Sequence, residues 1–196
     1  MRATRWPYRE RNLIMTEQVS PKEWVANMLS SMEPKLVASE AIKTGLLTKF
    51  IGTRQRRAMQ MILQGEEADW MATLILDLKK RIDAMPVTYE TQEQGDAAVV
   101  HLHYFLGSAD AWITEKDVGD PANNDFRQAQ AFGKVCFSGE LSEAEAGYVS
   151  IEELLANGFE LDLHWTQKSL KEIFGSIDDS TPSLPETDNQ DKPPVL

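Results

Sequence analysis

The chain has 196 residues, of which 42% are hydrophobic and 26% charged, and its formal net charge is −11. This length suits one ordinary domain with an appendage, and the hydrophobic content is normal for a packed core. Every apolar run is much shorter than the ~20 residues that cross a bilayer, and the first residues lack the apolar segment of a signal peptide. The single cysteine, Cys136, lies in an apolar run, so we expect a buried, inert thiol and no internal disulfide. We therefore expect a cytoplasmic protein without a membrane partner.

The acidic charge is concentrated in the second half of the chain. Residues 1–85 hold 14 Lys and Arg against 10 Asp and Glu, whereas residues 86–196 hold 6 against 21. Such an acidic half is a poor surface for nucleic-acid backbones, because they bind through Lys and Arg that displace counterions. It is a better surface for a basic protein or nucleoprotein.

Residues 1–14 differ from the rest of the chain. They are basic, contain Trp6-Pro7 and have neither a helical nor a strand period. Glu10-Arg11-Asn12 can be encoded by a purine-rich run of the kind that precedes bacterial start codons. We expect Met15 to be the native start and residues 1–14 to be a disordered, non-native leader.

Residues 15–85 have the apolar spacing of helices. Ser20 is a suitable N-cap for the first helix, because Pro21 and Glu23 follow it. The last helix carries acids in its first turn and Lys79-Lys80-Arg81 in its final turn, which the helix dipole favours. We expect helices at residues 20–32, 34–45, 53–65 and 66–84, with Trp70, Leu74, Leu78 and Ile82 on the apolar stripe of the last.

From Val87 the period changes to that of strands. Runs of β-branched and aromatic residues, each closed by Gly, Asn, Asp or Ser, are typical of an antiparallel sheet. Ser150 and Glu153 form a capping box, so we expect a helix that begins there and ends near Gly158. We expect strands at residues 87–90, 97–106, 111–116, 131–137, 148–149 and 160–165, and a final helix at residues 168–174.

The expected fold class is α+β. A helical N-terminal region (residues 15–85) precedes a domain at residues 86–174 that holds a small antiparallel sheet and one or two short helices. Residues 175–196 form a tail too polar to order itself. We expect the stripe that contains Leu78 and Ile82 to belong to the core of the sheet domain.

Several short segments occur in a fixed order along residues 86–174. They are Gln94-Gly95-Asp96-Ala97, Tyr104-Phe105, Trp112-Ile113-Thr114-Glu115, Phe132-Gly133, Gly147-Tyr148-Val149-Ser150-Ile151-Glu152-Glu153-Leu154, Asp162-Leu163-His164-Trp165 and Leu170-Lys171-Glu172-Ile173. This series resembles an uncharacterised bacterial domain family of unknown function, found on plasmids, phages and integrative elements. The resemblance implies a small α+β domain and a mobile-element setting, and it assigns no catalytic residues. The chain departs from the family pattern at His101, His103 and His164, and in its longer helical region.

Three histidines give one functional hypothesis. His101 and His103 are two residues apart, so both point to one face of a strand, and Asp162 and His164 repeat that spacing. On neighbouring strands, three imidazoles and a carboxylate can converge, which is enough for zinc or for acid–base chemistry in a small enzyme. The alternative is polar packing on the solvated face of the sheet. We rank polar packing first and predict neither a metal nor another cofactor.

A second hypothesis rests on the acidic residues. Regularly spaced carboxylates can occupy a groove built for phosphates, which is how a protein imitates nucleic acid. The sequence has no phosphate-binding glycine loop, serine-nucleophile elbow or Cys–His pair. We therefore predict a non-enzymatic interaction protein of a mobile element that inhibits or modulates a nucleic-acid-handling host or defence complex. An acidic protein that is merely soluble is the alternative. The expected partner-binding residues are Glu140, Glu143, Glu145, Asp117 and Asp120.

A third hypothesis is a DNA-binding accessory protein. Arg54, Arg56 and Arg57 open the helix expected at residues 53–65, where the helix N-terminus adds its own positive end. No aromatic residues alternate with these arginines, and no DNA-binding motif surrounds them. A solvated helix face, or a contact with the acidic half, explains the cluster more simply.

Overall fold

The computed structural model describes residues 20–123 and 125–178, and packing divides the chain between Glu33 and Pro34 into two units. The first unit includes the beginning of the first helix, and the second holds every other element. The domain boundary expected near residue 85 therefore falls inside the second unit.

Helix α1 (Pro21–Lys43) continues through Pro34, so the predicted interruption between residues 32 and 34 is wrong. Proline fixes φ near the helical value, and a helix can continue with the loss of one N–H hydrogen bond. A group of apolar side chains on this helix is exposed: Met28, Leu29, Met32, Leu36 and Val37.

Two further helices, α2 (Thr53–Ile62) and α3 (Ala68–Asp83), lie close to the predicted ranges. A 3-10 turn, η1 (Leu46–Lys49), joins α1 to α2. The buried face of α3 has helical spacing and consists of Ala68, Met71, Ala72, Ile75, Leu78 and Ile82. Trp70, predicted to lie on this stripe, is instead 48% exposed. The next residue, Met71, lies on the buried face instead.

The second half of the chain forms an antiparallel sheet of five strands in the order β5-β4-β3-β2-β6. The strands are β2 (Leu102–Leu106), β3 (Ala109–Glu115), β4 (Ala131–Cys136), β5 (Glu145–Val149) and β6 (Glu160–Leu161). A second pair joins β1 (Val99–Val100) to β7 (Lys168–Ser169). The other helical elements are η2 (Gln92–Ala97), η3 (Pro121–Asn123), η4 (Leu141–Glu143), α4 (Ile151–Ala156) and α5 (Leu170–Asp178). The α+β prediction is confirmed, with a larger sheet than expected.

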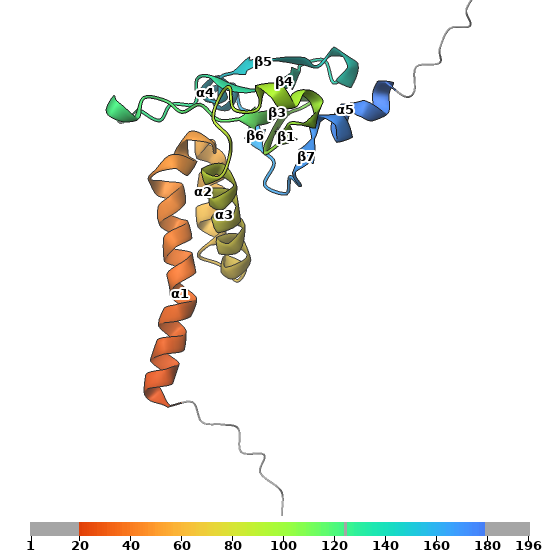
Figure 1. The fold of residues 1–196 in the computed structure, drawn as a ribbon. Helices are drawn as coiled ribbons and strands as arrows, with labels where there is room; N and C mark the ends of the chain where they lie inside the picture. Colours follow the sequence, from red (N-terminus) through yellow and green to blue (C-terminus); the bar gives the residue numbers. More distant parts are fainter. Residues whose placement is uncertain (1–19, 124, 179–196) are drawn as a thin grey trace, which may run out of the picture. The chain divides into compact units, whose positions relative to one another are not determined.

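One face of the sheet contributes to the main core. The cross-strand pairs Leu102–Ile113 and Tyr104–Ala111 belong to the same buried cluster as the apolar face of α3. The expectation that this helix shares the core of the sheet is therefore confirmed, and Figure 1 shows α2 and α3 beneath the sheet. Tyr104 is fully buried, and its hydroxyl donates a 2.8 Å hydrogen bond to the carbonyl oxygen of Phe50.

The opposite face of the sheet lies towards α5. The ring of Phe174 on this helix meets Trp112 of β3 edge to face, with centroids 5.1 Å apart. Trp112 also belongs to a smaller buried cluster, against which Phe174 packs. The cluster contains Ala98, Val100, Trp112, Cys136 and Leu170. Cys136 is 1% exposed, as expected for a structural thiol.

Four predicted elements differ from the structure. The single strand expected at residues 97–106 is divided into β1 and β2, which belong to different sheets. Residues 87–90 form no strand, and only an isolated bridge joins Val87 to Lys116. The strand expected at residues 160–165 ends at Leu161, because Asp162 accepts the backbone N–H of His164 in a turn. Helix α5 extends to Asp178, so residues 175–178 are helical rather than part of the predicted tail.

Two further expectations concern the ends of the chain. The predicted leader at residues 1–14 and the tail at residues 179–196 lie outside the described residues. Among the residues described, no helix combines the length and the hydropathy that a membrane crossing requires.

Candidate functional site

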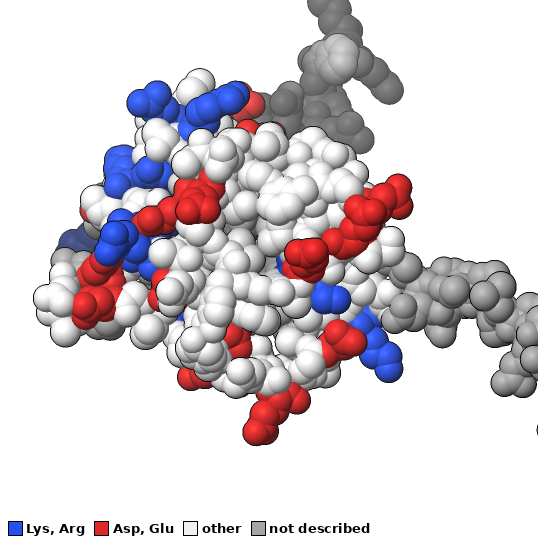
Figure 2. All heavy atoms as spheres, turned by 90° about the horizontal axis from the view of Figure 1, so that it is seen from above, with Lys and Arg blue, Asp and Glu red and all other residues white. Residues whose placement is uncertain are grey.

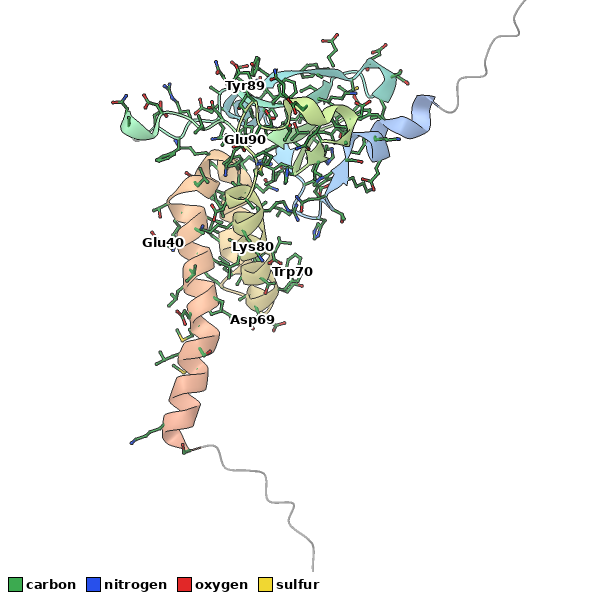
Figure 3. The ribbon with its side chains drawn as sticks, viewed as in Figure 1. Glu40, Asp69, Trp70, Lys80, Tyr89 and Glu90 are labelled. Atoms are coloured by element: carbon green, nitrogen blue, oxygen red, sulfur yellow. The ribbon has the colours of Figure 1, made fainter. Side chains whose placement is uncertain are left out.

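A pocket of about 270 Å³ opens on the α5 side of the sheet. We call it the tyrosine pocket, because two exposed tyrosines, Tyr89 and Tyr148, line it. Tyr89 lies on the segment that joins α3 to the sheet, as Figure 3 shows. Residues 88–98, three strands and α5 supply the lining: Thr88, Tyr89, Thr91, Gln92, Gly95, Asp96, Ala98, Thr114, Glu115, Phe132, Lys134, Ala146, Tyr148 and Leu170.

Glu115 is the buried carboxylate of this pocket and is 2% exposed. The register of β3 against β4 shifts between Ile113 and Glu115, so that Glu115 pairs with Phe132. Such bulges re-aim a side chain. The Glu115 carboxylate accepts hydrogen bonds from the backbone N–H of Tyr89 at 2.8 Å, and from the N–H and hydroxyl of Thr91, both at 2.5 Å. The Glu115 carboxylate is the acceptor in all three hydrogen bonds, which is the bonding pattern of an ionised carboxylate.

Tyr89 has a φ of +83°, and it is the one non-glycine residue of the described chain with a positive φ. A bulky residue rarely adopts this conformation, because its Cβ crowds the backbone. The hydrogen bond from the Tyr89 N–H to Glu115 helps to hold it. Backbone strain of this kind persists only where the surrounding structure maintains it. It is frequent at binding and catalytic sites.

Three aromatic rings form a corner around the pocket. Tyr89 and Tyr148 lie 6.1 Å apart at 73°, and Tyr148 and Phe132 lie 5.8 Å apart at 82°. The hydroxyl of Tyr148 donates a 2.6 Å hydrogen bond to that of Tyr89. This hydrogen bond, followed by desolvation and the nearby Glu115 charge, raises the pKa of Tyr148. Tyr148 therefore remains uncharged at neutral pH.

The charge of the pocket is unbalanced. Among the described residues, no Lys, Arg or His nitrogen forms an ion pair with Glu115. Lys134 also lines the pocket, but its ammonium lies 4.3 Å from the ring centroid of Phe174, over that ring. Asp96 adds a second, exposed carboxyl group. The pocket is thus a partly aromatic hollow with an unpaired buried negative charge.

The sequence did not single out the tyrosine pocket. Its lining includes Asp96, Thr114-Glu115, Phe132 and Tyr148, which come from four of the segments on which the family resemblance rests. Their convergence depends on the bulge in β3 and on the positive φ of Tyr89.

His103 lies in a polar and aromatic cluster of its own. Its Nε2 is 2.8 Å from Asp110 Oδ1, and its Nδ1 is 3.3 Å from Asp162 Oδ2. The rings of Trp112 and Trp165 lie next to it, with centroids 5.7 and 4.9 Å away. Both nitrogens can donate to carboxylates at once only when the ring carries two protons. This cluster satisfies its polar atoms internally, which supports the polar-packing hypothesis.

The other two histidines do not join this cluster. His101 Nδ1 is 2.7 Å from Gln167 Nε2, and the ring of His164 stacks on Trp70 at 6.0 Å. The proposed convergence of three imidazoles with Asp162 is absent, because residues 162–165 leave the sheet as a turn. Within residues 20–123 and 125–178, no group of three or more His, Cys, Asp or Glu is arranged to hold a metal ion.

The pKa of His101 is lowered from 6.5 by burial, and then by the charges of Arg81 and Lys116. The folded chain thus disfavours the protonated ring, whereas the unfolded chain takes up that proton as the pH falls through 6.5. This histidine therefore lowers stability on the acid side of neutrality. When the pH is lowered from about 7 to about 5, we expect the unfolding free energy of His101→Gln to fall less than that of the wild type. Urea unfolding at a series of pH values checks this, and parallel curves for the two proteins would contradict it.

The predicted partner-binding acids fall into two groups. Glu140, Glu143 and Glu145 are exposed around η4 and the beginning of β5. We call these three residues the acidic edge. Asp117 and Asp120 instead organise their own loop: Asp117 accepts the N–H groups of Gly119 and Gln130, and Asp120 accepts the side chain of Asn123.

The arginine cluster is only partly available. Arg56 donates to the carbonyl oxygens of Ile51 and Ile42, and so holds the end of α1 against α2. Arg54 and Arg57 are exposed. Two exposed arginines at one helix end make a weak phosphate site, because nucleic-acid affinity depends on the number of phosphates that a protein neutralises.

Comparison with known proteins adds no relative. No family model, no curated protein and no solved structure matches the chain.

Proposed function

We propose that this chain is a non-enzymatic interaction protein whose acidic half binds a basic protein or nucleoprotein. The observation that carries the proposal is a set of exposed carboxylates with no ion-pair partner among the described residues. In the acidic half these are Glu90, Glu93, Asp96, Asp120, Glu140, Glu143, Glu145, Glu152, Glu153, Glu160 and Glu172. In Figure 2 the acids are scattered over the visible face, and most of the Lys and Arg gather towards the left, with others among the acids at the lower right.

The acidic edge is one exposed part of this surface. It borders β5, which is an outer strand of the sheet and pairs only with β4. Charged residues on an outer strand discourage the addition of another strand. They still leave the strand open to a positively charged partner, whose approach they accelerate by long-range attraction.

The chemistry of the partner follows from the charge pattern. Separated carboxylates without neutralising cations suit a groove that normally holds phosphates, so we propose a nucleic-acid-handling protein as the target. The mobile-element setting implied by the family resemblance is compatible with such a target. The enzyme alternative has less support, because His103 is enclosed by Asp110 and Asp162 and Glu115 already accepts three hydrogen bonds.

Affinity capture from a bacterial lysate tests the proposal, with the captured protein identified and then purified. We expect one basic protein to be retained at physiological ionic strength, because screening over about 8 Å removes diffuse attraction first. Glu143→Lys combined with Glu145→Lys should slow association with that protein about tenfold at low salt.

A matched control separates the acidic edge from total charge. Glu66→Lys combined with Glu67→Lys reverses two exposed charges just before α3 and should leave association nearly unchanged. The proposal fails if nothing is retained at physiological salt, or if the two double variants slow association equally. Retardation of bare DNA by the wild-type chain would favour the site at Arg54 and Arg57 instead.

A further inference from the structure

The tyrosine pocket has an acceptor position that no described residue of the chain uses. A carboxylate offers about four lone-pair positions, two on each oxygen. Glu115 Oε1 accepts from both the N–H and the hydroxyl of Thr91, whereas Oε2 accepts only from the N–H of Tyr89. Oε2 therefore has one acceptor position that no described group occupies, and Glu115 is among the residues that line the pocket. A cationic donor would also neutralise the buried charge, which has no ion-pair partner among the described residues.

The aromatic walls favour the same kind of occupant. The faces of Tyr and Phe rings attract a cation within about 6 Å of the ring centroid. The ring planes of Tyr89 and Tyr148 meet at 73°, and those of Tyr148 and Phe132 meet at 82°. The three rings therefore form a corner and not a parallel stack. The chain already makes such a contact on this side of the sheet, where the Lys134 ammonium lies over Phe174.

The size of the pocket suits an occupant as small as a single side chain. Pockets for drug-sized ligands measure about 300–1,000 Å³, and this one is slightly smaller at about 270 Å³. Its place in the fold connects it to the acidic edge. Glu145 and Tyr148 are three residues apart on β5, which corresponds to about 10 Å at a rise of ~3.3 Å per residue. Their side chains point to opposite faces of β5, so a peptide bound at Glu145 reaches the pocket by crossing this outer strand with one side chain.

We infer that the tyrosine pocket binds an alkylammonium group, supplied by a lysine side chain of the basic partner. The ammonium donates to Glu115 Oε2, and the aliphatic stem packs against the rim formed by the rings of Tyr89 and Tyr148. The inference rests on the proposed function for the source of the lysine. The pocket chemistry itself can be measured without any partner.

The test is a titration of the full chain with Nα-acetyl-lysine amide, followed by amide NMR. The matched probe is Nα-acetyl-norleucine amide, which has the same stem without the ammonium group. We expect lysine amide to shift the resonances of Tyr89, Thr91 and Glu115 saturably, and to bind about fivefold or more tightly than norleucine amide. Tyr148→Leu keeps an apolar rim without a π face and should weaken lysine binding several-fold. Phe137→Leu alters an aromatic residue that is 72% exposed and does not line the pocket, and should have no effect.

Each result supports or overturns the inference. Equal binding of the two probes would show a merely apolar hollow, and the absence of saturable shifts would show no site. Equal losses in Tyr148→Leu and Phe137→Leu would place the binding elsewhere. Failure of the proposed function looks different, because the lysine probe would then still bind while no basic protein is captured.

Discussion

Glu115→Ala should destabilise the chain by about 3 kcal/mol and release the segment around Tyr89. The substitution removes the acceptor of three hydrogen bonds and leaves the N–H groups of Tyr89 and Thr91 without their partner. Each bond to a charged acceptor contributes about 1.5–3 kcal/mol, offset in part by the desolvation that burial of the carboxylate costs. Without the Glu115 acceptor, the positive φ of Tyr89 has less to maintain it. Urea unfolding measures the loss of stability.

Glu90→Ala is the matched control for Glu115→Ala. Glu90 belongs to the same turn and also accepts a backbone N–H, that of Val87, at 2.9 Å, but its side chain is exposed. We expect a loss below about 1 kcal/mol, because water replaces an exposed acceptor. Equal losses in the two variants would mean that Glu115 acts as an ordinary surface acid.

Gly133→Ala should be at least as damaging, at about 3 kcal/mol or more. A Cβ on Gly133 would lie 2.1 Å from the backbone oxygen of Trp112 and 3.0 Å from the Cα of Ile113. Both atoms belong to the backbone of the central strand β3, so neither can move without shifting the β3–β4 pairing. Thermal and urea unfolding would detect the loss.

Gly147 supplies the control within the same cross-strand pair. It lies opposite Gly133 on the outer strand β5, and a Cβ there would meet no atom within 4 Å. Gly147→Ala should therefore change the stability by less than about 1 kcal/mol. If the two alanine variants unfold alike, close strand contact is not the reason for glycine at position 133.

Much of the fold was predictable because its local signals agree with its tertiary structure. The buried face of α3 follows helical spacing, and the Ser150 hydroxyl accepts the N–H of Glu153 as the capping pattern predicts. The errors arose where local pattern and tertiary structure disagree. Asp162 and His164 have the spacing of a strand, but a side-chain bond from Asp162 to the backbone forms a turn instead.

The candidate site was less predictable than the fold. The acidic edge could be read from charge alone, because Glu140, Glu143 and Glu145 lie close together in the sequence. The tyrosine pocket could not, since a one-residue bulge decides where the side chain of Glu115 points. The histidine hypothesis failed for a related reason. Sequence spacing gives the face of a strand only when the strand exists and its register is known.

Amide chemical-shift mapping with a short lysine-rich peptide, at physiological ionic strength, tests the central claim most directly. A peptide with norleucine in place of lysine serves as the reference. The account predicts that the lysine peptide causes its largest shifts at Tyr89, Glu115, Glu145 and Tyr148, and that the norleucine peptide does not. Shifts spread evenly over all exposed acids, including Glu66 and Glu67, or shifts that vanish at this ionic strength, would contradict it.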